Sequence, residues 1–472
     1  MPEGLNFRII FAISAGAIGS SFQHGYNTGV LNAPQKLIES WIKNCPEGDG
    51  IGGNSTSDGI ESKCMDDTTV TLIWSWVVAI FCIGGMMGGS MVGFISSWLG
   101  RKGGLLLNNI LVVIAALLMG LSKMTGSFQM LIAGRLIIGI NSGLNAGLAP
   151  MYLSEIAPVS MRGAVGTVYQ LIITISILLS QILGMSNVLG TETGWPLLLA
   201  LTIVPAIFQV LTLPFCPESP KFLLLDKDDE MAANKALTWL RSTIEVHDEM
   251  DEMKQEQEAM KLVPKVTLKE MLTNSALRKP LIIANMMMLA QQLSGINAAI
   301  FFSTKIFESA GLDEQASQSA TLGMGAMNVA MTFVSLIMIE KAGRKTLMIS
   351  GLVGMFFMTT LLLVSLLLAE SLPWISYMAI VAVILFVVGF ATGPGSIPWF
   401  FVTELFSQSG RPIASSIAVA VNWSANFLVG LGFSPIQLAV GPYVFIIFMV
   451  TQLIFIAYVW FVVPETKNRT II

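Results

Sequence analysis

Gly100-Arg101-Lys102, a charged stretch between two apolar ones, returns as Gly343-Arg344-Lys345 in the second half of the chain. Two further charged stretches repeat in the same order and at nearly the same spacing. They are Glu155 with Arg162, which returns as Glu404 with Arg411, and Pro217-Glu218-Ser219-Pro220-Lys221, which returns shortened as Pro464-Glu465-Thr466-Lys467. Three ordered matches predict that the chain contains two copies of one unit, a pattern typical of membrane transporters.

The composition points to a membrane as the main solvent. The 472 residues are 54% hydrophobic and 12% charged, whereas a soluble domain carries about 25% charged residues. Long uncharged runs occur throughout, and a helix of about 20 apolar residues crosses a bilayer. The run 412–464 is long enough to cross twice, with a turn near Ser434-Pro435 or Gly441-Pro442. The sequence predicts an all-α membrane protein with twelve transmembrane helices.

The helices are expected in two pseudo-symmetric six-helix bundles joined by a polar linker. The central segment has apolar residues at helical spacing among many charges, which predicts short amphipathic helices. The predicted divisions are an N-terminal bundle over 1–215 with an external loop at 36–67, a cytoplasmic helical linker over 216–278, a C-terminal bundle over 279–464 and the start of a cytoplasmic tail over 465–472.

Basic residues lie in every second loop between the predicted spans, and loops of this kind face the cytoplasm. The loop 36–67 is acidic instead. The pattern therefore predicts a multi-pass protein with both termini in the cytoplasm and this loop outside. No basic patch or fold motif suggests nucleic acid as a partner.

The external loop contains two cysteines and one glycosylation sequence. Cys45 and Cys64 are hypothesised to form a disulfide, because the compartment is oxidising; two unpaired thiols are the alternative. Asn54-Ser55-Thr56 is a candidate acceptor for N-glycosylation. The first hydrophobic stretch, 9–34, is too long for a cleavable signal peptide.

The polar residues within the spans are nearly all neutral amides. Amides donate and accept hydrogen bonds, which suits a solute covered in hydroxyl groups, whereas fixed charges would suit an ion. Gln170 and Gln181 share one helix face, and Gly295 is expected to loosen its helix. The amides are Gln170, Gln181, Gln291, Gln292, Asn297, Asn328, Asn422 and Asn426. The alternative is that such amides only join helices together.

The run Gly393-Pro394-Gly395-Ser396-Ile397-Pro398 is expected to break its helix, which is tolerated where the freed backbone meets neighbours or a water-filled cavity. Trp399 follows it and can stack on the apolar face of a sugar. Phe390, just before the run, is also a candidate substrate contact. A purely structural kink is the alternative.

The repeated charges are all expected at cytoplasmic ends of spans, where they are candidates for an inner gate between the bundles. Exposed ion pairs contribute only about 0–1 kcal/mol, which suits contacts that break in every cycle. The alternative is that they only set the topology. The candidate gate residues are Arg101, Glu155, Arg162, Glu340, Arg344, Glu404 and Arg411.

At these motifs the chain resembles the sugar-porter branch of the major facilitator superfamily, and most closely the facilitative glucose transporters of animals. Further motifs that carry the resemblance are 25–30, 32–36, Gly134-Arg135, Met151-Tyr152 and 291–297. The resemblance implies the major facilitator fold, a plasma-membrane location and rocker-switch alternating access. It also implies that the sugar is held by Gln170, Gln291, Gln292, Asn297, Asn328, Trp399 and Asn426, and that the charged set forms the inner gate.

Some positions depart from the best-known glucose carriers. Met288-Leu289-Ala290 stands where they carry Gln-Leu-Ser, and Ala391 replaces a glutamate that would touch the sugar. Phe301-Phe302 replaces a tyrosine pair on the outer lid. Trp399 is retained and favours glucose over fructose.

The leading hypothesis is energy-independent uniport of D-glucose or a related hexose. Proton-coupled relatives have a carboxylate near the arginine of the fourth span, but here that position is Asn27, so Arg135 is expected to cap nearby carbonyl groups or the polar face of a neighbouring helix instead. The alternatives are a proton–sugar symporter that uses His24, a fructose-preferring uniporter, or a receptor that binds sugar without carrying it. An enzyme, a cofactor and a metal site are not expected, since the two histidines, His24 and His247, lie far apart.

Overall fold

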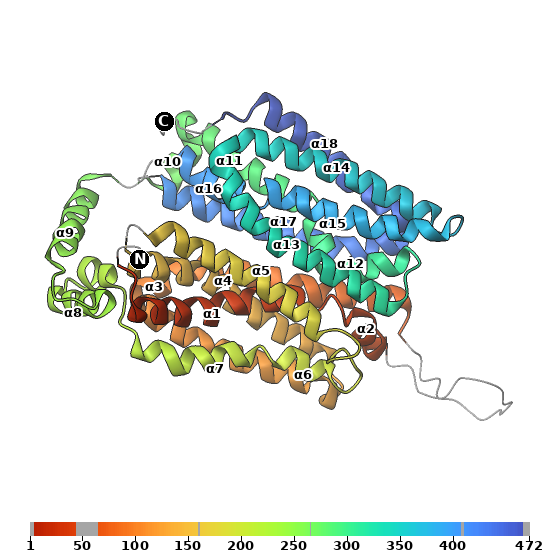
Figure 1. Cartoon of the computed structure of the whole chain (residues 1–472), viewed down its shortest axis with the longest axis horizontal. Helices are drawn as coiled ribbons and strands as arrows, with labels where there is room; N and C mark the ends of the chain where they lie inside the picture. The colour runs from red at the N-terminus through yellow and green to blue at the C-terminus, as the bar shows by residue number, and fades with distance from the viewer. Residues whose placement is uncertain (1–3, 44–64, 159–160, 265, 407–409, 466–472) are drawn as a thin grey trace.

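The computed structural model describes residues 4–43, 65–158, 161–264, 266–406 and 410–465, and the regular secondary structure of these ranges is helical. Two groups of long helices lie side by side (Figure 1). The first group, called the N-half here, comprises α1 (Phe7–Gly29), α2 (Gln35–Lys43), α3 (Asp67–Thr125), α4 (Phe128–Ile156), α5 (Arg162–Leu183), α6 (Trp195–Ala200), α7 (Ile203–Thr212) and η2 (Leu213–Phe215).

The second group, called the C-half, follows a set of short helices. The C-half comprises α11 (Ser275–Leu293), α12 (Ile296–Ser309), α13 (Glu314–Ala342), α14 (Arg344–Leu368), η4 (Pro373–Ile375), α15 (Ser376–Thr392), α16 (Ile397–Leu405), α17 (Arg411–Val440), η5 (Gly441–Tyr443) and α18 (Val444–Phe461). The short helices between the halves are η3 (Phe222–Asp226), α8 (Glu230–Arg241), α9 (His247–Leu262) and α10 (Leu268–Thr273).

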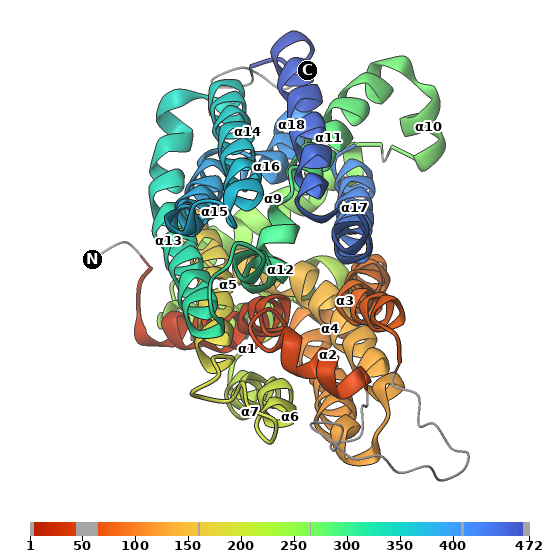
Figure 2. The ribbon, with the colours of Figure 1, turned by 90° about the vertical axis from the view of Figure 1, so that its right-hand side faces the viewer.

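The two ends of the bundle differ in what they carry. The start of α1, the end of α18 and α8–α10 lie at one end, called the terminal end, and α2 lies at the other, called the loop end (Figure 1). Viewed along the helices, the two halves form separate clusters that meet along α1, α3 and α5 on one side and α12, α13 and α17 on the other (Figure 2).

The lengths of the helices account for twelve membrane crossings. Six segments of the described chain are long and apolar enough to cross a membrane, and two of them, of 59 and 51 residues, are long enough to cross twice. The remaining four crossings are α1, α5, the pair α11–α12, and α13. The six segments are Asp67–Thr125, Phe128–Ile156, Trp195–Phe215, Arg344–Leu368, Pro373–Trp399 and Arg411–Phe461.

The breaks in the helices fall where glycine and proline predict them. Gly295, with φ of 99°, separates α11 from α12, and such a positive φ favours glycine. The run that follows Thr392 separates α15 from α16. The turn after α17 lies at Gly441-Pro442 rather than at Ser434-Pro435, because the helix continues through Pro435.

Glycines allow close backbone contact between α3 and α4. A Cβ atom added to Gly84 of α3 would lie 2.4 Å from the carbonyl oxygen of Leu136, and one added to Gly139 of α4 would lie 2.3 Å from that of Phe81. Membrane helices gain no hydrophobic driving force from packing on each other, so small residues that permit backbone contact stabilise them. The close backbone contact therefore stabilises the pairing of α3 with α4.

Candidate functional site

The repeated charged stretches of the N-half converge on the kink in α3. Gly100 adopts φ of 78° there, and the Glu218 carboxylate accepts hydrogen bonds from the backbone N–H of Arg101 at 3.1 Å and of Lys102 at 3.0 Å. A carboxylate at these free N–H groups stabilises the start of a helix. The Arg101 guanidinium binds Glu155 at 3.0 Å and Asp226 at 3.2 Å.

The second copy builds the same arrangement in the C-half. Gly343 adopts φ of 84° between α13 and α14, and Glu465 accepts from the backbone N–H of Arg344 at 3.0 Å and of Lys345 at 3.1 Å. The Arg344 side chain binds Glu404 at 2.8 Å. The repeat in the sequence therefore encodes a helix cap and an ion pair, made once in each half. The sequence analysis did not predict that Glu218 and Glu465 cap helices. The repetition of these two glutamates in the two halves was the signal that could have indicated it.

None of the described ion pairs of the repeated arginines joins the two halves. Arg101–Glu155 joins α3 to α4, and Arg344–Glu404 joins α14 to α16. Arg411 donates to the backbone oxygen of Phe406 at 3.1 Å, also within the C-half. The side chains of Arg162 and Glu340 lie outside the described part of the structure. Pairing across the halves, the proposed gate, stays a prediction.

Four amide side chains from three helices form one hydrogen-bonded network in the C-half. Asn422 of α17 donates to Gln291 Oε1 at 2.7 Å, and Gln292 of α11 donates to Asn422 Oδ1 at 3.1 Å. Asn297 of α12 donates to Gln292 Oε1. All four side chains are buried. The sequence identifies Gln291, Gln292 and Asn297 as substrate contacts, but Asn422 was noticed only as a neighbour of Asn426, because its partners depend on how α17 packs.

The network also holds the broken helix between α15 and α16. Gln291 Nε2 donates to the carbonyl oxygens of Pro394 and Gly395, each at 2.9 Å. A break in a membrane helix leaves carbonyl groups that need partners, and Gln291 supplies two of them. With its Oε1 bound by Asn422, Gln291 is committed to protein groups in this conformation, so a sugar must share or replace these bonds.

Other predicted substrate residues retain free hydrogen-bonding capacity or exposed surface. Gln170 is exposed and Asn328 is half-buried. Asn426 is half-buried, and its Oδ1 has no hydrogen-bond partner within the described structure. Trp399 is 44% exposed and Phe390 half-buried. These five side chains come from α5, α13, α15, α16 and α17, so they are contributed by both halves.

Gln181 is the most isolated of the predicted set. Its side chain is 1% exposed, and both of its polar atoms lack a partner among the described residues. A Cβ atom added to Gly325 of α13 would lie 2.4 Å from Gln181 Oε1. Gln181 of the N-half therefore lies directly against the C-half, where a glycine makes room for it.

Hydrogen bonds close the contact between the halves at the loop end. Asn32, which follows α1, donates to the Ile300 oxygen at 2.9 Å and to Ser303 Oγ at 2.7 Å, and it accepts from the Thr304 N–H at 3.1 Å. Gln318 of α13 accepts from the Ser186 N–H at 2.8 Å. These bonds join the end of α1 and the end of α5 to α12 and α13. They were not predicted, because they depend on the relative position of the two halves.

Arg135 is buried in an uncharged environment. Its Nη1 donates to the Asn27 oxygen at 2.8 Å, its Nε donates to the Val77 oxygen at 3.2 Å, and its guanidinium lies 4.7 Å from the centre of the Phe81 ring. The prediction that Arg135 caps carbonyl groups is confirmed. The Asn27 side chain donates to Thr202 Oγ1 at 2.9 Å.

His24 contacts the opposite half through its ring. The His24 and Trp423 rings stack with centroids 6.0 Å apart. The His24 Nδ1 atom has no hydrogen-bond partner in the part of the chain described here. His24 is therefore placed at the contact between α1 and α17 and, within the described residues, away from any carboxylate partner.

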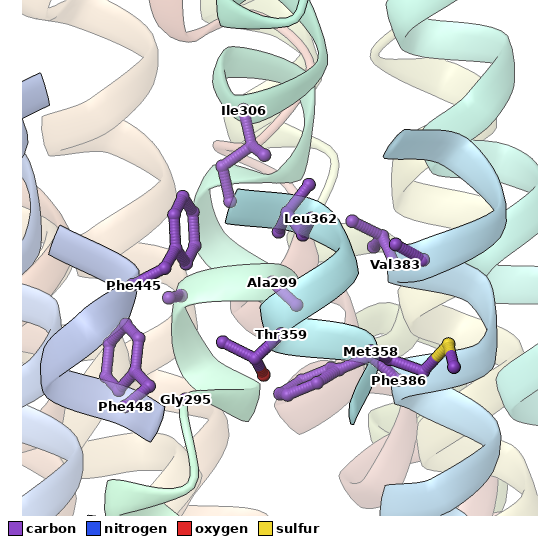
Figure 3. Close-up of a pocket in the computed structure, with 12 residues that line it drawn as sticks. Gly295, Ala299, Ile306, Met358, Thr359, Leu362, Val383, Phe386, Phe445 and Phe448 are labelled. Carbon is purple, nitrogen blue, oxygen red and sulfur yellow. The ribbon is translucent and has the colours of Figure 1, made fainter. Parts of the chain in front are cut away.

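A separate apolar hollow lies inside the C-half, next to the break at Gly295 (Figure 3). Phe445 and Phe448 point into it from α18, and Phe386 and Val383 from α15. Its wall includes Thr359, whose hydroxyl donates to the Met355 oxygen at 2.7 Å. None of the predicted sugar contacts lines this hollow, so it is distinct from the amide network.

The remaining expectations concern the external loop and metal binding. Cys45, Cys64 and Asn54 lie outside the described residues. Within the described ranges, no group of three or more His, Cys, Asp and Glu side chains is placed to hold a metal ion.

Comparison with known proteins identifies the family. The family described as "Sugar (and other) transporter" matches residues 12–472. This chain is a member of that family. It is 45% identical over 463 residues to the facilitated glucose transporter member 1 of solute carrier family 2 from Gallus gallus, covering 98% of this chain and 92% of that protein. It is 46% identical over 467 residues to member 4 from Mus musculus, covering 98% and 89%.

Solved structures of other transporters have the same fold as this member of the sugar transporter family. The partially occluded inward-open conformation of the xylose transporter XylE from E. coli matches with a TM-score of 0.80 at 22% identity, covering 99% of this chain and 100% of that one. The D-xylose–proton symporter matches with a TM-score of 0.76 at 21% identity, covering 98% and 100%. The chain thus has the major facilitator fold, with twelve transmembrane helices in two pseudo-symmetric bundles and a helical linker.

Proposed function

We propose that this protein carries D-glucose or a closely related hexose across the plasma membrane, down the gradient of the sugar, by alternating access. The observation that carries the proposal is identity of 45–46% with facilitated glucose transporters over 98% of the chain. The neutral amides suit this substrate, because each offers a donor and an acceptor to hydroxyl groups. A carrier rather than an enzyme is proposed.

The proposed sugar contacts are the residues that the sequence singled out. They fall into two kinds, according to whether their side chains are already hydrogen-bonded to other protein groups. Gln291, Gln292 and Asn297 form a preorganised network on the C-half. Gln170, Asn328, Asn426, Trp399 and Phe390 offer unpaired or exposed groups, and buried Gln181 offers unpaired ones. We assign the two kinds different roles: the network holds the helix break in shape and offers preformed contacts to the sugar, and the others complete the contacts when sugar enters.

The proposed orientation puts the terminal end in the cytoplasm and the loop end outside. The proposed domains are 1–215, 216–278, 279–464 and 465–472. The hydrogen bonds of Asn32 and Gln318 then close the external side, and the cytoplasmic charges form the inner gate in the opposite conformation. Labelling of single introduced cysteines at the two ends with an impermeant reagent tests the orientation; labelling of the terminal end from outside intact cells would contradict it.

We propose uniport rather than proton symport because the side chains around Arg135 are uncharged. Its partners are carbonyl oxygens and an aromatic ring, and Asn27 cannot carry a proton. The second candidate is proton symport through His24, favoured by the unpaired His24 Nδ1 atom. Glucose uptake into proteoliposomes with and without an imposed pH gradient separates the two. The final glucose concentration inside the proteoliposomes is expected to be the same with and without the gradient. Accumulation of glucose above its equilibrium concentration would overturn uniport.

The choice of hexose is tested separately. Trp399 favours glucose over fructose on the resemblance to the glucose carriers. Competition of a series of hexoses against labelled glucose is expected to rank glucose above fructose. The reverse order would support a fructose-preferring uniporter, and binding without counterflow of labelled sugar would indicate a receptor.

A further inference from the structure

The segment between α9 and α11 exposes apolar side chains that the folded chain leaves uncovered. Leu268 and Leu272 lie four residues apart on α10, so they share one face, and they are 55% and 51% exposed. Leu262, at the end of α9, is 84% exposed. Exposed apolar side chains that recur along one segment indicate a surface that contacts something other than water.

Basic side chains accompany these leucines. Lys261, Lys269, Arg278 and Lys279 are exposed, and the described ion pairs include none of the four. Glu270 is the only acidic residue between 261 and 279. The helix before this segment, α9, is rich in Asp and Glu instead. The charge thus changes from acidic to basic as the chain approaches α11.

The position of α10 is fixed by an anchor into the C-half. Met271 is fully buried in one apolar cluster with Leu281 of α11 and Phe406. The Asn274 side chain, between the two helices, accepts from the Ala276 N–H at 3.0 Å and so caps α11 immediately after α10 ends. The leucines and the cations therefore belong to a docked element.

The docked segment stands out sideways from the helices. In the view along the bundle, α10 extends beyond the outline of α11 and α17 (Figure 2). Because α11 enters the membrane directly after α10, an element that projects sideways at this level lies over the lipid around the protein. Continuity with a membrane helix favours the bilayer surface over a soluble partner as its contact.

We propose that Leu262, Leu268 and Leu272 together with Lys261, Lys269, Arg278 and Lys279, called the α10 patch, bind anionic phospholipids of the leaflet at the terminal end. The leucines enter the boundary between headgroups and acyl chains, and the cations bind the headgroups. The proposal rests on the membrane orientation given under the proposed function. Buried Met271 connects the helix that carries this patch to α11, the helix of Gln291 and Gln292.

Lipid retention by the full chain tests the patch. The purified protein is titrated with phosphatidylserine or phosphatidylcholine in detergent, and bound lipid is measured by native mass spectrometry. Each cation near the surface contributes about 1 kcal/mol, equivalent to about fivefold in affinity. Lys269→Gln is therefore expected to weaken phosphatidylserine binding about fivefold and to leave phosphatidylcholine unchanged. The matched control is Lys235→Gln on α8, which is also exposed and is expected to have no effect.

A second pair of variants tests the apolar face. Leu272→Ser is expected to weaken retention of both lipids, whereas Met231→Ser on α8, where Met231 is 85% exposed, is expected to leave both unchanged. Equal binding of the two lipids by the unaltered protein, or equal effects of Lys269→Gln and Lys235→Gln, would overturn the proposal. Because no sugar is used, a failure here is separate from a failure of the transport assay.

Discussion

The two ends of the contact between the halves are built from different chemistry. At the loop end, neutral groups such as Asn32 and Gln318 form hydrogen bonds from one half to the other. At the terminal end, charged groups form the pairs that we describe, and Arg101–Glu155 and Arg344–Glu404 each stay within one half. The structure is therefore closed at the loop end by contacts that must break for that end to open. Variants at the two ends are expected to shift the conformational equilibrium in opposite directions.

The largest effect is expected from Asn32→Ala. The variant removes three hydrogen bonds that exist only when the loop end is closed, and a buried group left unpaired costs about 1–3 kcal/mol. The equilibrium should shift toward the state open at the loop end by about tenfold, which corresponds to 1.4 kcal/mol. The measurement is the ratio of affinities for impermeant inhibitors applied from each side.

Asn109→Ala is the matched control for this variant. Asn109 is also buried, but it bonds Gln209 at 3.0 Å within the N-half. Its substitution is expected to lower stability without moving the inhibitor ratio. A similar change of ratio in both variants would show that the effect of Asn32 is not specific to closure.

Gln291 lies between the two ends of the bundle. Gln291→Ala is therefore expected to lower glucose affinity equally in the states open at either end. Loss of a hydrogen bond to the sugar costs about 0.5–1.5 kcal/mol, and more here because the Pro394 and Gly395 carbonyls lose their partner. Glucose affinity should fall from both sides, while the ratio of inhibitor affinities stays constant. Unchanged glucose binding would contradict the assignment of Gln291 to the site.

Glu404→Gln is expected to act opposite to Asn32→Ala and more weakly. If Glu404 helps to close the terminal end in the other conformation, its neutralisation favours the state open at that end, by about 0–1 kcal/mol as for other partly exposed pairs. The double variant with Asn32→Ala should give an intermediate ratio, because distant sites add. Shifts in the same direction for both single variants would refute the division of roles.

The smallest expected effect is a pH dependence at the loop end. Burial raises the pKa of Glu39 on α2 above its ordinary value of 4.5; Glu308 and Asp67 act in the same direction, and the hydrogen bond from Gln35 and the charge of Lys305 oppose it without cancelling it. The neutral form is therefore favoured by the fold, and its stabilising contribution is lost as the pH rises through the raised pKa. At neutral pH, Glu39→Gln should unfold at a higher temperature than the unaltered protein, and the difference should vanish as the pH falls to about 4.5. A difference that does not vary with pH would contradict this.

Much of the fold could be predicted because the signals are local. Apolar length gives the crossings, Gly295 gives the break between α11 and α12, and the repeated charges mark equivalent positions in the two halves. The carbonyl capping by Arg135 followed from the absence of a carboxylate at Asn27. These features depend on one or two neighbouring segments.

The partners of the polar residues could not be predicted in the same way. The sequence shows that Gln291 and Asn422 are amides in spans, but only the packing of α11 against α17 brings them together. Likewise, nothing in the residues around Asn32 indicates that its partners come from α12. Such contacts depend on the relative position of helices that are far apart in the chain.

The neutral hydrogen bonds of Asn32 and the charged Arg344–Glu404 pair respond differently to ions in the surrounding solution. Dissolved ions screen interactions between charges over about 8 Å at physiological ionic strength, and they hardly affect a buried amide. The Arg344 and Glu404 side chains are 16% and 24% exposed, so screening reaches them only in part, while Asn32 is 1% exposed. Added salt should therefore weaken the Arg344–Glu404 pair while leaving the hydrogen bonds of Asn32 unchanged.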